Sequence, residues 1–175
     1  CEPGGSRERK GNMRKQTKVS RRVILGSCVA GVVLLSGLGL ALAQTYTLNP
    51  TYGTRGLRPG FTPDPVVVNL TAGGSINTRT SGPAPSCGWV ANAPDYRVNW
   101  SGGSALHFTA TSGSDVTLLI NAPNGGWRCN DDTSGTNPAL SFANAPAGQY
   151  DVWVGTYNQG NQPAVLRVSE LRQMW

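Results

Sequence analysis

Residues 148–157 read Gly-Gln-Tyr-Asp-Val-Trp-Val-Gly-Thr-Tyr, and this stretch decides the fold. In an extended chain Tyr150, Val152 and Val154 lie on one face, while Asp151 and Trp153 lie on the other. Alternation with a period of two residues predicts a β-strand that buries the face carrying Tyr150 and the two valines.

The same alternation recurs in both directions from this stretch, and Gly-, Pro- and Asn-rich turns separate the runs. Six further runs predict strands over residues 66–70, 96–100, 106–110, 116–120, 140–142 and 164–168. Asn124-Gly125, between two apolar runs, is a specific signal for a β-hairpin. We therefore expect an all-β protein: an antiparallel β-sandwich of about eight to ten strands, with Greek-key or jelly-roll topology.

The excess positive charge is confined to the first part of the chain. The chain has 15 Lys and Arg against 9 Asp and Glu, a net charge of +6, and residues 1–43 carry all of that excess. Residues 44–175 have no net charge and no lysine, and their arginines are scattered, which argues against nucleic acid as a partner.

An apolar run over residues 23–43 follows the basic residues and ends in Ala41-Leu42-Ala43. This order is typical of a secretory signal peptide, which we place at residues 13–43, with residues 1–12 an upstream segment outside the protein proper. A retained membrane anchor is the alternative, and contact with a membrane is expected only through such an uncleaved segment. Arg21-Arg22 leaves the twin-arginine and the general secretion routes open. The protein is expected to be exported, to the periplasm or outside the cell.

The remaining chain divides into two parts. Residues 44–63, which contain three prolines, are expected to form an extended N-terminal segment, and residues 64–175 the β-sandwich domain. Cys87 and Cys129 are the two cysteines left after the leader, and an even pair in an exported domain predicts one disulfide.

Catalytic chemistry has little support in the sequence. A Ser-His-Asp triad needs a histidine, and the only one is His107. The alternation places it in the middle of a strand, on the other face from Leu106 and Phe108. Such a histidine is usually a surface or packing residue. Because no nucleophile motif or nucleotide-binding loop is present either, we expect no enzymatic activity.

The densest polar cluster, residues 129–137, has the composition of a metal-binding loop. Asn130, Asp132 and Ser134 are oxygen ligands at alternate positions, but the closing Glu of an EF-hand is missing. Asp115, which precedes the strand over 116–120, could complete a Ca²⁺ shell with the loop. The alternative is a solvated turn, in which Asn and Asp side chains bond to their own backbone.

Several short motifs in a fixed order resemble a family of small secreted bacterial proteins that are often labelled peptidase S1. They include Tyr52-Gly53-Thr54, Cys87-Gly88-Trp89 and, in the second half, residues 115–121, 127–132 and 148–157. The second half resembles the bacterial pre-peptidase C-terminal domain. The resemblance implies a jelly-roll-like β-sandwich, often with a calcium site, here at Asp115, Asn130, Asp131 and Asp132. It implies no catalytic residue.

Aromatic residues supply a second kind of candidate site. Asp151, Trp153 and Tyr157 share one strand face and, if that face is exposed, could bind a sugar or a protein. If another segment covers the face, these residues are structural. We therefore expect a secreted, non-catalytic module with a structural calcium site that binds or supports an unidentified protein or polysaccharide. The alternatives are a carbohydrate-binding module using this face and a small hydrolase, as the family label suggests.

Overall fold

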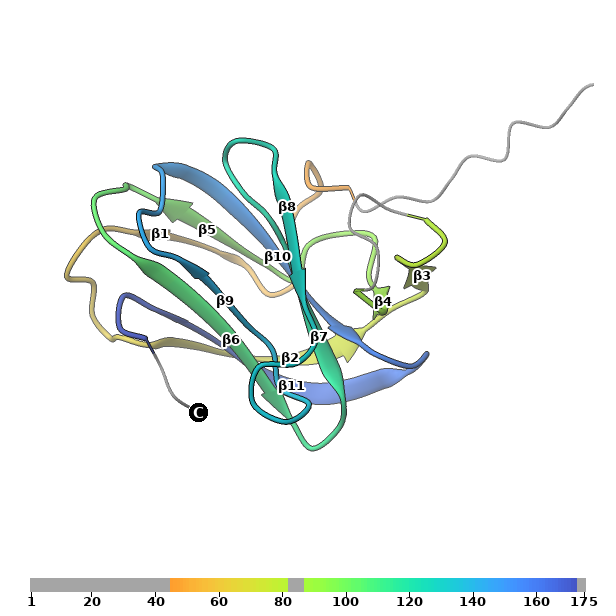
Figure 1. The fold of residues 1–175 in the computed structure, drawn as a ribbon. Coiled ribbons are helices and arrows are strands. Elements are labelled where there is room, and N and C mark those ends of the chain that lie inside the picture. The colour runs from red at the N-terminus through yellow and green to blue at the C-terminus, as the bar shows by residue number, and fades with distance from the viewer. Residues whose placement is uncertain (1–44, 82–86, 173–175) are drawn as a thin grey trace, which may run out of the picture. The chain divides into compact units, whose positions relative to one another are not determined.

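The computed structural model describes residues 45–81 and 87–172, and the predicted upstream segment and signal peptide lie outside this range (Figure 1). The described residues form β-strands and connecting loops and no helix, so none of their segments is a helix able to cross a membrane. The strands are β1 (Thr54–Leu57), β2 (Val66–Gly73), β3 (Ile76–Asn77), β4 (Trp89–Val90), β5 (Tyr96–Trp100), β6 (Leu106–Ser112), β7 (Val116–Asn121), β8 (Trp127–Asn130), β9 (Ala139–Phe142), β10 (Gly148–Thr156) and β11 (Asn161–Ser169).

The strands form two sheets that pack as a sandwich. Sheet A has seven strands, in which β10 pairs with β5, β7 and β4, and β1, β8 and β3 are added outside these. Sheet B has four strands in the order β2-β11-β6-β9. All pairs are antiparallel except β1 with β5. The predicted all-β sandwich is confirmed.

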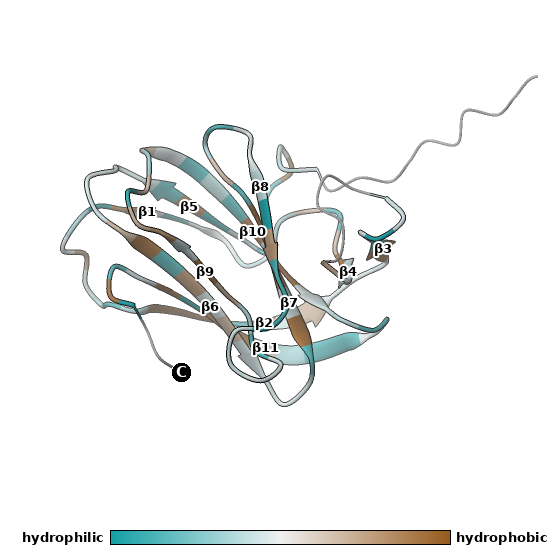
Figure 2. Cartoon of the chain, in the orientation of Figure 1, coloured by the Kyte–Doolittle hydropathy of each residue, from teal (hydrophilic) through white to brown (hydrophobic). Residues whose placement is uncertain are grey.

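The main core lies between the sheets and contains the inward faces of the predicted alternating runs. Tyr150, Val152 and Val154 of β10 are fully buried there, against residues of sheet B such as Phe108 and Leu166. Figure 2 shows the apolar segments along these strands. Because a slip of one residue would turn these inward side chains to the other face of their sheet, the core sets the register.

A second, smaller core lies on the other face of sheet A. It consists of Ile76, Cys87, Val90, Leu119 and Trp153. The disulfide between Cys87 and Cys129, with its Cα atoms 5.7 Å apart, ties the segment before β4 to β8 and confirms the predicted pair. One end of the outer face of sheet A is thus covered.

The hairpin predicted at Asn124-Gly125 joins β7 to β8. The Gly125 N–H donates to the carbonyl of Ala122, and the Ala122 N–H donates to the carbonyl of Gly126. Gly125 has a φ of 76°, a left-handed conformation that favours glycine. This turn places Trp127 directly opposite Asn121.

The expectation that residues 44–63 lie outside the sandwich is wrong for residues 54–61. Within them β1 pairs in parallel with β5, and Leu57 and Phe61 enter the main core. The stretch gave no strand signal because its first three residues are exposed and only the fourth is buried, so it does not alternate.

Candidate ligand-binding site

The face of β10 that carries Asp151 and Trp153 is not an exposed aromatic stripe. Trp153 has no exposed surface and Asp151 is 1% exposed, whereas Tyr157, beyond the end of β10, is 38% exposed. Trp153 packs in the second core beside Ile76 and Val90. The prediction of a binding stripe through Trp153 is therefore wrong, because the disulfide-linked segment covers that end of the sheet.

Next to the covered end, four side chains form a row across sheet A. Asp151 of β10 lies directly opposite Arg97 of β5 on one side and Asn121 of β7 on the other, and Asn121 lies opposite Trp127 of β8. Directly opposite residues point to the same face of a sheet. The row therefore shares the outer face of sheet A with Trp153, which lies two residues further along β10.

A hollow of about 550 Å³ lies over this row, and we call it the trough. Its lining includes Tyr46, Asn121, Trp127, Gln149 and Asp151. A volume of this size is in the range of small-molecule sites in proteins. The aromatic lining comes from the first described residues and from β8, and the polar lining from the middle of sheet A.

Asp151 holds the polar part of the trough in place. Its Oδ1 accepts a hydrogen bond of 2.6 Å from Arg97 Nε in an ion pair, and its Oδ2 accepts one of 2.7 Å from Gln149 Nε2. Arg97 also donates to the backbone carbonyls of Tyr46 at 2.6 Å and Leu48 at 2.9 Å. Through Arg97, the buried carboxylate thus helps to fix the segment that carries Tyr46, which Asn92 also holds by accepting two hydrogen bonds from Thr45.

The ring of Trp127 packs against the ring of Trp153. The two ring centroids are 5.2 Å apart with an interplanar angle of 36°. Trp127 is only partly buried, and Tyr46 is 48% exposed. Two accessible aromatic rings beside amide and carboxylate groups can stack on a flat apolar ligand face and hydrogen-bond to its hydroxyl groups.

Sequence reasoning found Asp151 but missed Tyr46, Asn121, Trp127 and Gln149. Alternation assigns Asn121 and Trp127 to faces of their own strands, but only the register between strands brings them beside Asp151. No pattern in the sequence around Tyr46 predicts a binding residue, because its position depends on contacts with distant residues, such as the hydrogen bond from Arg97 to its carbonyl.

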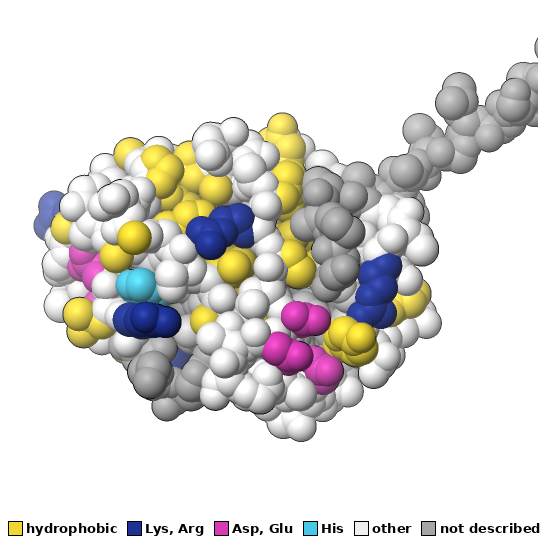
Figure 3. All heavy atoms as spheres, viewed as in Figure 1, with side chains coloured by type: hydrophobic (Ala, Val, Ile, Leu, Met, Phe, Trp, Pro, Cys, Tyr) yellow, Lys and Arg dark blue, Asp and Glu magenta, His cyan; other side chains and the backbone are white. Residues whose placement is uncertain are grey.

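The predicted metal ligands lie near one another but do not form a complete ligand set. Burial raises the pKa of Asp115, and the carboxylates of Asp132 and Asp131 raise it further, while Arg79 opposes them. Oδ1 of Asp115 is buried and has no hydrogen-bond partner. Figure 3 shows acidic side chains gathered on one face. Within residues 45–81 and 87–172, no three Asp, Glu, His or Cys side chains are grouped closely enough to hold a metal ion.

Asn130 has a structural role in this loop. Its Oδ1 accepts hydrogen bonds from Thr133 Oγ1 at 2.7 Å and from the Ala139 N–H at 3.0 Å. Its Nδ2 donates to the carbonyl of Asp132 at 3.3 Å. These are the bonds of a self-bonded turn, so the amide oxygen of Asn130 is used within the loop.

His107 does not belong to a catalytic triad in the part of the chain that the structure describes. Its Nδ1 is 2.7 Å from Ser141 Oγ, on the strand directly opposite, and no carboxylate is hydrogen-bonded to the ring. A triad requires a third group that orients the imidazole.

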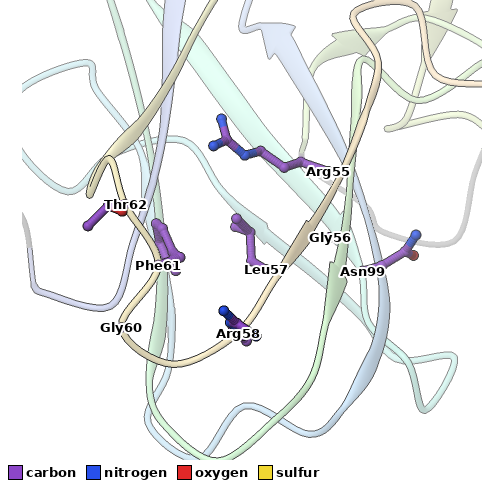
Figure 4. A pocket seen from close by; sticks show the side chains of 8 residues that line it. All are labelled: Arg55, Gly56, Leu57, Arg58, Gly60, Phe61, Thr62 and Asn99. Carbon is purple, nitrogen blue, oxygen red and sulfur yellow. The ribbon is translucent and has the colours of Figure 1, made fainter.

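A further hollow of about 430 Å³ lies beside β1. Figure 4 shows Arg55, Leu57 and Phe61 with Thr62 on one side of the β1 backbone, while Asn99 points away from them. Leu57 and Phe61 are buried, and both of the arginines that line the hollow, Arg55 and Arg58, are exposed. No ligand is assigned to it.

Comparisons with known proteins found similarity among solved structures. No family model matches the chain, and no curated protein matches it. Among solved structures, the chain is similar to the pre-peptidase C-terminal domain of collagenase from Bacillus anthracis, with 13% identity and a TM-score of 0.45. The match covers 70% of this chain and 100% of that domain.

Proposed function

We propose that this protein is a secreted, non-catalytic β-sandwich module that binds a carbohydrate in the trough. The observation that carries the proposal is the row from Arg97 through Asp151 and Asn121 to Trp127, with Tyr46 at its edge. The disulfide favours an oxidising compartment, as expected for an exported protein.

A sugar ring suits this lining because it has both apolar and polar surface. Its C–H face can stack on Trp127 or Tyr46, and its hydroxyl groups can bond to the exposed amide of Gln149 and to Oδ1 of Asn121, whose Nδ2 donates to the Gly125 carbonyl. Asp151 already accepts bonds from Arg97 and Gln149, so its main effect is to orient Gln149. The rigid arrangement lowers the entropic cost of binding.

The test is retention of the protein on insoluble or immobilised polysaccharides, followed by measurement of Kd for the one that binds. Tyr46→Ala and Trp127→Ala should each weaken binding about tenfold, because each removes an aromatic contact worth about 1.4 kcal/mol. Tyr157→Ala is the matched control: Tyr157 is 38% exposed against 48% for Tyr46, but it lies outside the trough. Equal losses in Tyr157→Ala and Tyr46→Ala would contradict the proposal.

Calcium binding is a second proposal, supported by Asp115. A buried carboxylate oxygen without a partner, in the negative field of Asp131 and Asp132, would be stabilised by a hard cation. Because these three carboxylates are not grouped closely enough to hold an ion as they stand, binding would require the loop to bring Asp131 and Asp132 towards Asp115, and the charge of the ion would offset their repulsion.

For the calcium proposal we expect a higher Tm in Ca²⁺ than in a chelator, since a ligand at 100 times its Kd stabilises the folded state by about 2.7 kcal/mol. Asp115→Asn should abolish the difference. An identical Tm in Ca²⁺ and chelator would exclude the site.

A further inference from the structure

The edge of the sandwich where β8 approaches β9 contains a second polar hollow, separate from the trough, of about 400 Å³. We call it the basic hollow. Its lining includes His107 and Thr109 of β6, Arg128 of β8, Ser141 of β9 and Arg172 after β11. No Asp or Glu contributes to this lining.

The two arginines reach the basic hollow from different segments. Arg128 Nη1 donates to the Ser141 carbonyl at 2.8 Å, and its guanidinium lies 4.7 Å from the centre of the Phe142 ring, so the side chain is held across the edge. Arg172 is exposed and forms no ion pair with any described residue. Figure 3 shows histidine and arginine side chains close together on this face.

His107 completes the cationic lining. Ser141 Oγ bonds to its Nδ1, and Nε2 has no protein partner among the residues described. Burial lowers the pKa of His107, and Arg172 lowers it further, while Asp64 opposes them. On β11, Ser169 lies directly opposite His107, and Arg167 donates to Thr111 Oγ1. Of the two charged groups that act on the imidazole, Arg172 has a larger effect than Asp64.

We propose that the basic hollow binds a tetrahedral oxyanion, the phosphate or sulfate group of an extracellular ligand. Two guanidinium groups, an imidazole that can accept a proton, and the hydroxyl group of Thr109 supply donors from several directions. Because residues 44–175 have no net charge, this attraction is local to the hollow.

The chain has a single histidine, so one imidazole signal in an NMR titration reports on this site if the protein carries no histidine tag. The pKa of His107 is measured in chloride and, at equal ionic strength, in inorganic phosphate, inorganic sulfate and acetate. A bound anion favours the imidazolium form, so phosphate and sulfate should raise the pKa by about 0.5 to 1 relative to chloride. Phosphate and sulfate are distinguished by which of them acts at the lower concentration.

Arg172→Ala should raise the pKa of His107 in chloride and abolish the further rise in phosphate and sulfate. Arg58→Ala is the matched control, since Arg58 is another exposed arginine lining a hollow of similar volume, and it should keep the full rise. Identical pKa values in chloride, phosphate and sulfate would overturn the proposal, as would a rise that persists in Arg172→Ala. An equal effect of acetate would overturn the tetrahedral assignment.

Discussion

Two buried carboxylates, Asp95 and Asp151, differ in how their charge is stabilised. Asp151 is paired with Arg97 and receives a second hydrogen bond from Gln149. Asp95 is 3% exposed, and Oδ2 accepts a 2.7 Å bond from the Val154 N–H. Burial raises the pKa of Asp95 to about 7, and the Val154 bond only partly opposes it. The charge on Asp151 is therefore supported by an arginine, and that on Asp95 by a backbone N–H.

At the residue scale, Asp95 predicts a pH dependence of stability. Its folded-state pKa of about 7 exceeds the ordinary value of 3.8, so the folded protein binds the proton more tightly. The free energy of unfolding should fall as the pH rises from about 4 to about 7, by up to about 4 kcal/mol, and level off above that. Denaturant unfolding across this range measures the effect.

Asp95→Asn should remove most of that fall, because the amide oxygen can still accept the Val154 N–H and carries no charge. Above pH 7 this variant should be more stable than the parent protein. Asp132→Asn, at an exposed carboxylate that acts on the pKa of Asp115, should leave the part of the fall due to Asp95 in place. If Asp95→Asn retained the full decrease, Asp95 would not be its source.

At the scale of elements, β10 has neighbours on both edges and both faces. Gly155 lies where this crowding is greatest, since an added Cβ would be 2.4 Å from Thr117 Oγ1 and 2.7 Å from the Trp89 carbonyl oxygen. A side chain at this position would push β4 away from β10. Glycine is therefore needed here for close packing of strands.

Gly155→Ala should lower the free energy of unfolding by about 1 to 3 kcal/mol, the usual cost of overpacking. Gly113→Ala is a suitable comparison, because no atom lies within 4 Å of its added Cβ and its φ is not positive. Chemical denaturation of both variants tests this. Similar free energies of unfolding for the two variants would show that β4 moves to make room for the side chain without loss of stability.

The elements also show what the sequence can predict. The seven alternating runs are strands in the structure. They could be predicted because each buries one face in the main core, which leaves an alternating pattern in the sequence. β3 and β4 have two residues each, too few to alternate. For the candidate site, the alternation correctly placed Asp151 and Trp153 on one face of a strand. Only the fold shows that the segment at Cys87 covers Trp153 and leaves Trp127 accessible.

At the scale of the whole molecule, the trough and the basic hollow differ in charge. In the trough the charge of Asp151 is balanced by its ion pair with Arg97, whereas the basic hollow is lined by arginines and by no acidic residue. Residues 44–175 as a whole have no net charge. Long-range attraction therefore does not distinguish ligands for this protein, and local chemistry must.

The dependence of Kd on salt concentration should distinguish binding in the trough from binding in the basic hollow. Binding of a neutral polysaccharide should keep its Kd within about twofold between low and high salt, since screening acts on exposed charges and not on stacking. Binding of phosphate or sulfate to the basic hollow should weaken over the same range. A polysaccharide Kd that rises steeply with salt would place that ligand on an ionic surface instead of in the trough.

The contact between Trp127 and Trp153 gives the protein a built-in optical signal. Two indole rings with centroids 5.2 Å apart are close enough for their electronic transitions to couple, which produces paired bands of opposite sign in circular dichroism. One ring of the pair lines the trough and the other is locked in the second core. Occupation of the trough can therefore be followed as a change in this coupled signal, without any label.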